Sequence, residues 1–181
     1  MNETRWLEAD EQRLWRAWLR INTRLFARLD AELQAAHDLS MADYEVLVNL
    51  SEAPERSLRM AELAERLRLS PSGLTRRLDG LVRDGMVERK KCPSDGRGSL
   101  AMLTPDGLAL LEATAPTHVA GVRRYFVDPL SPTEQRELAR SLDVIEDRLA
   151  QSPGPSLPGC PPCPGEPVIN GQQAGCPHLD Q

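Results

Sequence analysis

Basic side chains are concentrated in the middle of this 181-residue chain. The whole chain carries 22 lysines and arginines against 27 acidic residues, which gives a net charge of −5. Between Arg56 and Arg97 the balance is reversed, with 11 basic and 6 acidic residues. A local positive surface in an acidic chain attracts phosphate groups, so this segment is the candidate nucleic-acid-binding site.

A predicted helix presents part of this charge. Ser70 is a preferred N-cap residue, Pro71 suits the first helical position, and Asp84 and Gly85 would end the helix. One face is apolar and would pack into the core, whereas the other is free to bind. The apolar face comprises Leu74, Leu78, Leu81 and Val82, and the free face comprises mainly Ser72, Thr75, Arg76, Arg77, Asp79 and Arg83.

Neighbouring elements complete the order of a winged helix-turn-helix. Residues 60–69 repeat the apolar spacing, which predicts a second helix joined to the first by a tight turn. Residues 86–91 and 100–104 flank a turn-rich segment and predict a β-hairpin. Its tip is basic through Lys90, Lys91 and Arg97, and would lie along a phosphate backbone. This order of elements indicates DNA binding.

Long amphipathic helices are predicted on both sides of this unit, over residues 8–36, 106–126 and 131–150. The last would begin with a capping box formed by Ser131 and Glu134. Such helices could pair with a second copy of the chain, which would place two recognition helices roughly 34 Å apart, one turn of DNA. A monomeric helical bundle is the alternative.

Composition favours a mainly α-helical fold with a small β-hairpin wing, because 40% of the residues are hydrophobic but only 4% are aromatic. We expect one domain over residues 1–151, in which a DNA-binding lobe (40–104) lies between dimerisation helices (8–36 and 106–150). No run approaches the roughly 20 apolar residues of a membrane span, and the N-terminus lacks a secretory signal. A cytoplasmic location without a membrane partner is therefore expected.

In element order and in local motifs, the chain resembles the MarR family of transcriptional regulators over roughly residues 8–150. The motifs that carry the resemblance are 39–47, 60–64, 69–81, 95–98 and 103–107. The resemblance implies a homodimer that binds a pseudo-palindromic operator in double-stranded DNA. Most members of the family repress transcription. Many release DNA when a small, often aromatic or phenolic, molecule binds between the dimer helices and the DNA-binding lobe.

Residue roles follow from the resemblance position by position. The residues that match the recognition-helix surface are Ser70, Ser72, Thr75, Arg76 and Arg77. Arg97 matches a wing arginine that enters the minor groove, Lys90 and Lys91 would contact phosphates, and Asp95 matches an acid that orients a recognition-helix arginine. Gly96 departs from the family, which often has a second arginine there. An ordinary solvated face is the alternative for the helix arginines, and local packing or capping is the alternative for Thr75.

Several larger side chains are candidates to line an effector pocket, although such residues at helical spacing more often belong to a core or an interface. They are Trp15, Trp18, Met41, Tyr44, His118 and Tyr125. His118 could titrate near neutral pH, but a lone histidine on a helix more often has a structural hydrogen bond.

The cysteines suggest two alternative sensing functions. Cys92 lies in the basic wing, where positive charge favours the reactive thiolate. Thiol-sensing relatives, however, carry their reactive cysteine near the start of the first or second helix, and this chain has none there. The Pro- and Gly-rich segment 152–181 is expected to be disordered. It contains four potential zinc ligands, Cys160, Cys163, Cys176 and His178, whose alternatives are a disulfide or a solvated appendage.

Three classes of function can be compared on this basis. A ligand-responsive DNA-binding repressor is favoured. A winged-helix protein-interaction module without DNA binding is the second class. An enzyme is not expected, because the chain has no phosphate-binding loop or nucleophile elbow and its three histidines are scattered. No cofactor is expected either.

Overall fold

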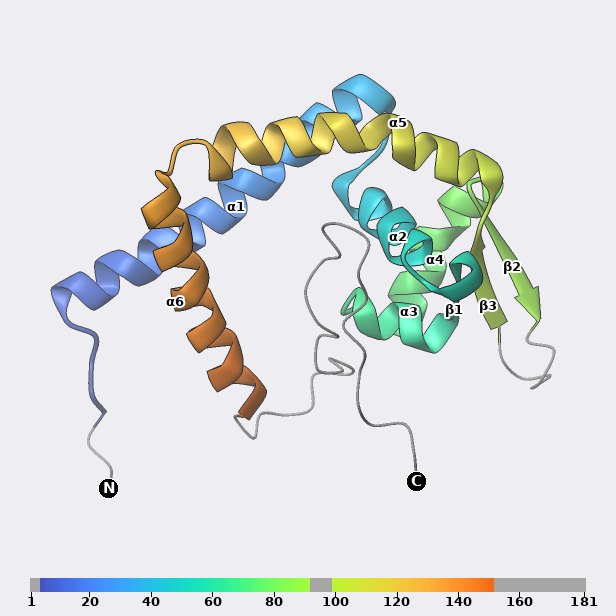
Figure 1. Ribbon diagram of the computed structural model, residues 1–181. Coiled ribbons are helices and arrows are strands. Elements are labelled where there is room, and N and C mark those ends of the chain that lie inside the picture. Colours follow the sequence, from blue (N-terminus) through green and yellow to red (C-terminus); the bar gives the residue numbers. More distant parts are fainter. Residues whose placement is uncertain (1–3, 92–98, 152–181) are drawn as a thin grey trace.

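The computed structural model describes residues 4–91 and 99–151. Two long helices, α1 (Ala9–His37) and α5 (Pro105–Val122), run side by side along one edge of the molecule (Figure 1). A compact lobe lies at one end of this pair, and α6 (Pro132–Gln151) extends from the other end. The three predicted long helices are thereby confirmed, with boundaries within a few residues of those expected.

The lobe contains three short helices: α2 (Met41–Ser51), α3 (Met60–Arg66) and α4 (Pro71–Arg83). Between α2 and α3 lie a 3₁₀ turn (Pro54–Arg56) and a short strand, β1 (Ser57–Arg59). The predicted hairpin is formed by β2 (Val87–Lys91) and β3 (Ser99–Leu103), which pair antiparallel from Val87 opposite Leu103 to Lys91 opposite Ser99. The mainly helical fold with a small wing is confirmed.

The sheet has three strands rather than the two that the sequence predicts. β1 pairs antiparallel with β3, so the strand order is β1-β3-β2 and β2 is an edge strand. Only one residue of β1, Leu58, is buried. Three residues with one buried side chain give no alternating pattern, so the sequence alone does not predict this strand.

Capping residues define where the helices start. The Ser70 hydroxyl accepts a hydrogen bond from the Gly73 amide at 3.1 Å, as predicted. Thr104 caps α5 and also donates to the carbonyl oxygen of Gly85 at 2.8 Å, which joins α5 to the turn after α4. Gly85 has φ of +77°, a conformation that glycine adopts at little cost.

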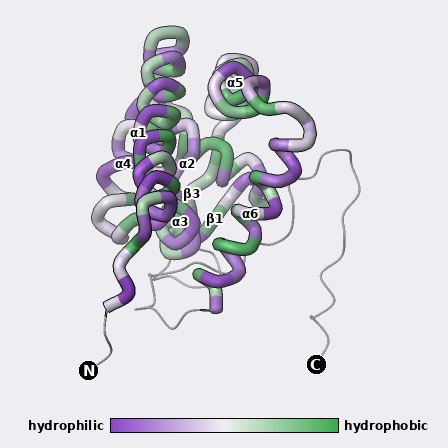
Figure 2. Tube along the Cα trace, turned by 90° about the vertical axis from the view of Figure 1, so that its left-hand side faces the viewer, coloured by the Kyte–Doolittle hydropathy of each residue, from purple (hydrophilic) through white to green (hydrophobic). Residues whose placement is uncertain are grey.

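The apolar core lies within the lobe and where the lobe meets the C-terminal part of α1 and the N-terminal half of α5. The side chains of Leu74, Leu78 and Leu81 on α4 are buried in it, as the helical spacing predicts. By contrast, α6 has no buried residue, although Figure 2 shows hydrophobic positions along it. Within the described part of a single copy, the helix is therefore at most partly covered, at residues such as Leu138 and Leu142.

α5 continues into a π-helical turn, Arg123–Val127, which leads towards α6. α1 and α5 pack closely, because a Cβ atom added to Gly121 would lie 2.7 Å from Cδ2 of Leu29. Among the described residues, none of the helices combines the length and apolar character needed to cross a membrane.

Candidate nucleic-acid interface

The outward face of α4 carries the polar side chains that the sequence singled out. Ser72, Thr75, Arg76 and Asp79 are exposed on it, opposite the buried leucines. Ser70 and Ser72 lie at the helix N-terminus with their hydroxyl oxygens 3.2 Å apart. Two hydroxyls beside the free amides of a helix N-terminus suit a phosphate oxygen.

Thr75 and Arg76 differ in whether their polar groups already have a hydrogen-bond partner among the described residues. The Thr75 hydroxyl donates to the carbonyl oxygen of Pro71 at 2.9 Å, so it acts on its own helix while the side chain stays exposed. Arg76 is exposed and makes no hydrogen bond or ion pair within residues 4–91 and 99–151. Its guanidinium group is thus available to an external acceptor.

Arg77 does not share this outward position. Its Nη1 atom lies 3.9 Å from Oδ1 of Asp43 on α2, and its side chain is only 30% exposed. Asp43 in turn accepts a hydrogen bond from Ser40, the N-cap residue of α2. The structure therefore places Arg77 against the neighbouring helix, where it links α4 to α2.

Arg89 on β2 was not among the predicted site residues. Its Nη1 atom lies 2.9 Å from Oδ1 of Asp79, and its Nη2 atom donates to the carbonyl oxygen of Thr75 at 2.8 Å. Both partners belong to α4. The sequence contained one signal for this contact, because Arg89 follows the buried Val87 by two residues and so shares its face of the strand.

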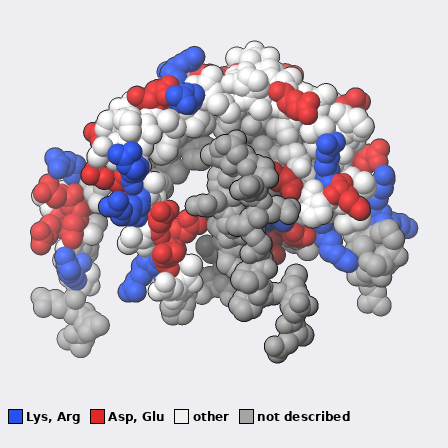
Figure 3. Space-filling view, viewed as in Figure 1, with Lys and Arg blue, Asp and Glu red and all other residues white. Residues whose placement is uncertain are grey.

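The strand that carries Arg89 also carries the two predicted wing lysines, both exposed. Nζ of Lys90 lies 3.1 Å from Oε2 of Glu88 on the same strand. In Figure 3, basic side chains lie along the right-hand edge of the molecule over the winged lobe, with acidic groups among them. Asp95, Arg97 and Cys92 lie outside the described residues.

The structure brings two of the six candidate pocket residues into contact. The rings of Tyr44 on α2 and His118 on α5 have centroids 4.7 Å apart. Nδ1 of His118 is buried without a hydrogen-bond partner among the described residues. Burial lowers the pKa of His118, and it raises the pKa of Tyr44 with a smaller contribution from the charge of Glu52. Both shifts favour the neutral form of the side chain.

The other four candidates do not converge on this pair. Trp15 and Trp18 are 53% and 44% exposed on the N-terminal part of α1, about 20 Å along the helix from its buried C-terminal part. The Tyr125 hydroxyl donates to Glu32. Met41 is half-buried at the start of α2, where its amide donates to Asp30 at 2.7 Å.

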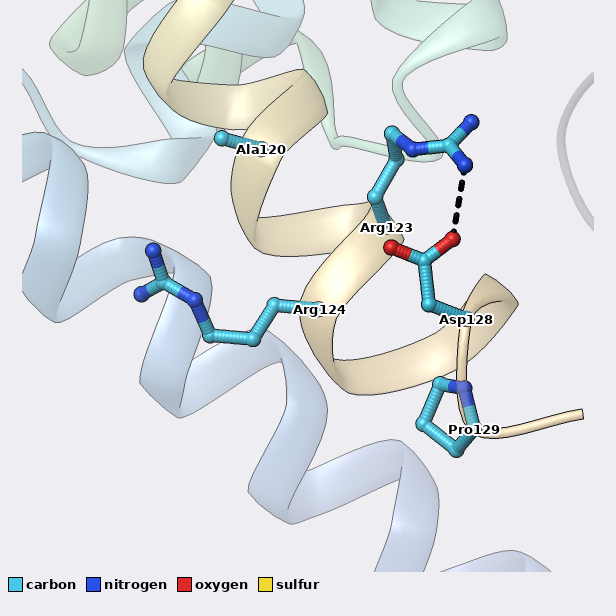
Figure 4. Close-up of a pocket in the computed structure, with 5 residues that line it drawn as sticks. All are labelled: Ala120, Arg123, Arg124, Asp128 and Pro129. Atoms are coloured by element: carbon cyan, nitrogen blue, oxygen red, sulfur yellow. Dashed lines mark hydrogen bonds and ion pairs between the residues drawn. The ribbon is translucent and has the colours of Figure 1, made fainter.

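A shallow depression lies instead at the end of α5, lined by Ala120, Arg123, Arg124, Asp128 and Pro129 (Figure 4). Nη2 of Arg123 lies 2.7 Å from Oδ1 of Asp128, while Arg124 reaches to Glu32 of α1 at 3.2 Å. Both arginines therefore already have acidic partners. The two positive charges at this depression are therefore balanced by two carboxylates, which does not favour an anionic ligand.

No group of three or more potential metal ligands occurs among the residues that the structure describes. The four candidate zinc ligands, Cys160, Cys163, Cys176 and His178, fall outside that part of the chain.

Known proteins share this architecture. A family model described as the MarR family matches residues 37–98. The transcriptional repressor YetL of Bacillus subtilis is 31% identical over 116 residues, which cover 64% of this chain and 69% of the repressor. A MarR family transcriptional regulator from Streptomyces coelicolor, solved in complex with DNA, has a TM-score of 0.80 and 38% identity over 88% of this chain and 99% of its own. AbsC, another such regulator from the same organism, has a TM-score of 0.76 and 41% identity over 82% of this chain and 100% of its own.

Proposed function

Because this chain belongs to the MarR family of transcriptional regulators, we propose that it binds a specific operator in double-stranded DNA as a homodimer and represses transcription. The observation that carries the proposal is the outward face of α4, where Arg76 is exposed with no partner in the described chain. A related regulator of known structure was solved on DNA. Enzymatic activity forms no part of this function, since the relatives are regulators.

In the proposed complex, α4 enters the major groove with its N-terminal end towards the phosphates. Ser70 and Ser72 would bind a phosphate oxygen, and Arg76 would read a base edge, because arginine commonly pairs with guanine. The exposed methyl group of Thr75 suits a thymine methyl. Lys90 and Lys91 would contact the backbone beside the groove. By the family resemblance, Arg97 would enter the minor groove and Asp95 would orient a recognition-helix arginine from the wing.

The dimer is proposed from the apolar surface that a single copy leaves exposed. On α6, Ile145 and Leu149 are 55% and 70% exposed, and they share one stripe with Leu138 and Leu142. Leu14, Trp15 and Ile21 are exposed on α1. Large apolar patches on a soluble chain mark an interaction surface. A second copy would cover them through the helices from both ends of the chain.

An effector site is proposed beside Tyr44 and His118, where the lobe meets α5. A phenolic hydroxyl could donate to the unpartnered Nδ1 atom of His118, and an aromatic ring could pack on Tyr44. A molecule bound there would lie between the long helices and α2, the helix that precedes the helix-turn-helix. His118→Phe should abolish release of DNA by a phenolic effector while leaving operator binding intact.

DNA binding is tested by titrating the purified protein against its own upstream region and a scrambled duplex at low and physiological salt. The proposal predicts binding to the native duplex roughly 10³-fold tighter, with affinity that falls steeply as salt rises. Equal weak binding to both duplexes would call for a genome-wide operator selection. If that selection also enriched no sequence, the proposal would fail in favour of a protein-interaction module.

A further inference from the structure

We propose that Arg89 and Asp79 form a positioning pair that holds the wing strand against the recognition helix, and that specific DNA binding depends on this pair. The inference rests on the DNA-binding function proposed above. Arg89 then has a role different from that of the neighbouring lysines, because its guanidinium group binds acceptors within the protein rather than a phosphate.

The geometry of the guanidinium group carries the inference. One nitrogen lies 2.9 Å from the Asp79 carboxylate, and the other donates to the Thr75 carbonyl oxygen at 2.8 Å. The two acceptors are four residues apart on α4, so they lie one helical turn apart on one face. A planar group with divergent N–H donors can reach both at once, whereas an ammonium group is a point charge that replaces only one contact well.

The position of β2 in the sheet explains why such a contact is needed. β2 is an edge strand and pairs only with β3 among the described strands. Val87 anchors its first residue in the core, but every later residue of the strand is exposed. Arg89 therefore provides the only described side-chain attachment between α4 and the part of β2 that leads to Lys90 and Lys91.

Electrostatics makes the role of Asp79 testable. An acidic side chain on the outward face of a recognition helix repels DNA phosphates, so its removal should by charge alone strengthen binding. The positioning role predicts the opposite. Without Asp79, Arg89 loses its charged partner, the wing is no longer fixed to α4, and the lysine contacts to the backbone weaken.

The decisive variant is Asp79→Asn, with Glu88→Gln as its matched control. Each removes one acidic charge, and the two residues lie on adjoining elements of the same lobe. We expect Asp79→Asn to weaken operator binding about tenfold, whereas Glu88→Gln should leave it unchanged or tighten it. Operator affinity of Asp79→Asn equal to or above that of the parent protein would overturn the inference.

Arg89→Lys separates positioning from a direct phosphate contact. It retains the positive charge but loses the two-point attachment, so its operator affinity should fall as far as that of Asp79→Asn. Its salt dependence should also become shallower, since wing phosphate contacts are lost. Full affinity in Arg89→Lys would mean that Arg89 serves only as a charge, which would contradict the inference.

Hydrogen exchange in the absence of DNA tests the pair independently of the proposed function. Amides of residues 87–91 should exchange about tenfold faster in Asp79→Asn than in the parent protein, with no change in Glu88→Gln. Unchanged exchange in Asp79→Asn would refute the positioning role. If the parent protein failed to bind any operator while exchange responded as expected, the DNA-binding function alone would be wrong.

Discussion

Arg76 is the residue on which operator recognition should depend most strongly. It is exposed on α4 and has no partner among residues 4–91 and 99–151, so no contact with that part of the chain has to break before it binds a base. We expect Arg76→Ala to cost about 1–3 kcal/mol of specific binding free energy and to relax the sequence preference at one base position. Fluorescence anisotropy with operator and single-base variants measures both effects.

Arg136→Ala is the control, because this arginine lies on α6 and hydrogen-bonds to Thr133. It removes the same charge far from the recognition helix in sequence. Equal losses in the two variants would indicate a general charge effect rather than base recognition by Arg76.

His118 should make the stability of the protein depend on pH. Burial lowers its pKa in the folded state, so the unfolded chain binds a proton more readily than the folded protein. Stability is therefore fully present above the unfolded pKa of about 6.5 and is lost as the pH falls through the folded value. His118→Gln should show a smaller loss between about pH 7.5 and 5.5 in urea unfolding. An identical pH dependence in the variant would show that other groups cause it.

The sequence could predict which residues of α4 face the core but not what its polar residues contact. Leucine spacing located the buried stripe, since the helical period alone determines it. Arg76 and Arg77 looked equivalent by the same criterion, yet the second lies against Asp43 on α2. That contact, like the one between Arg89 and Asp79, depends on how separate elements pack, and no local pattern records it.

At the scale of elements, the start of α5 is fixed to the end of the recognition unit by close contact at Gly107. A Cβ atom there would lie 2.1 Å from the carbonyl oxygen of Met86 and 2.8 Å from Cδ1 of Leu103. Since the first of these is backbone, Gly107→Ala must displace the turn that joins α4 to β2. We expect a loss of about 1–3 kcal/mol in the free energy of unfolding.

Gly80→Ala supplies the matched control within α4. A Cβ atom added there meets only a flexible guanidinium nitrogen of Arg83, at 3.8 Å. Alanine is the better helix former, so this variant should gain about 0.5–1 kcal/mol. Chemical unfolding of both variants gives the comparison, and a stabilised Gly107→Ala protein would contradict the tight junction.

The predictable parts of the fold were those that local chemistry determines. The caps at Ser70 and Ser131 and the hairpin between β2 and β3 follow from residue types within a few positions of one another. β1 forms only because β3 has a second free edge, and Trp15 and Trp18 lie away from Tyr44 and His118 because α1 continues well beyond the lobe. Both outcomes depend on tertiary arrangement.

For the whole molecule, we propose that residues 1–151 are sufficient for folding and DNA binding. Among the described residues, the elements that position the candidate interface all lie within that range. Deletion of residues 152–181 should therefore leave the melting temperature and the operator affinity unchanged. It also removes Cys160, Cys163, Cys176 and His178, so zinc content measured on both proteins decides the metal alternative. Stoichiometric zinc in the full chain that is lost on deletion would favour a zinc-responsive regulator.

Dimerisation and DNA binding should be lost together when the apolar stripe of α6 is broken. Ile145 is 55% exposed in one copy, so glutamate is tolerated there by the isolated chain but would place a charge in the proposed interface. We expect Ile145→Glu to be monomeric by analytical ultracentrifugation. Its operator affinity should fall roughly 10²-fold, because two linked lobes bind far more tightly than one.

Arg136→Glu tests whether Ile145→Glu loses dimerisation and DNA binding because the apolar stripe is broken, rather than because α6 has gained an acidic side chain. By helical spacing, position 136 lies on the face opposite Ile145, so the variant should remain dimeric and bind the operator.

The winged lobe of Ile145→Glu should keep its melting behaviour, since the core residues of the lobe lie outside α6. A monomer that still bound the operator with full affinity would show that one lobe suffices, and the two-fold arrangement would then have no role in recognition.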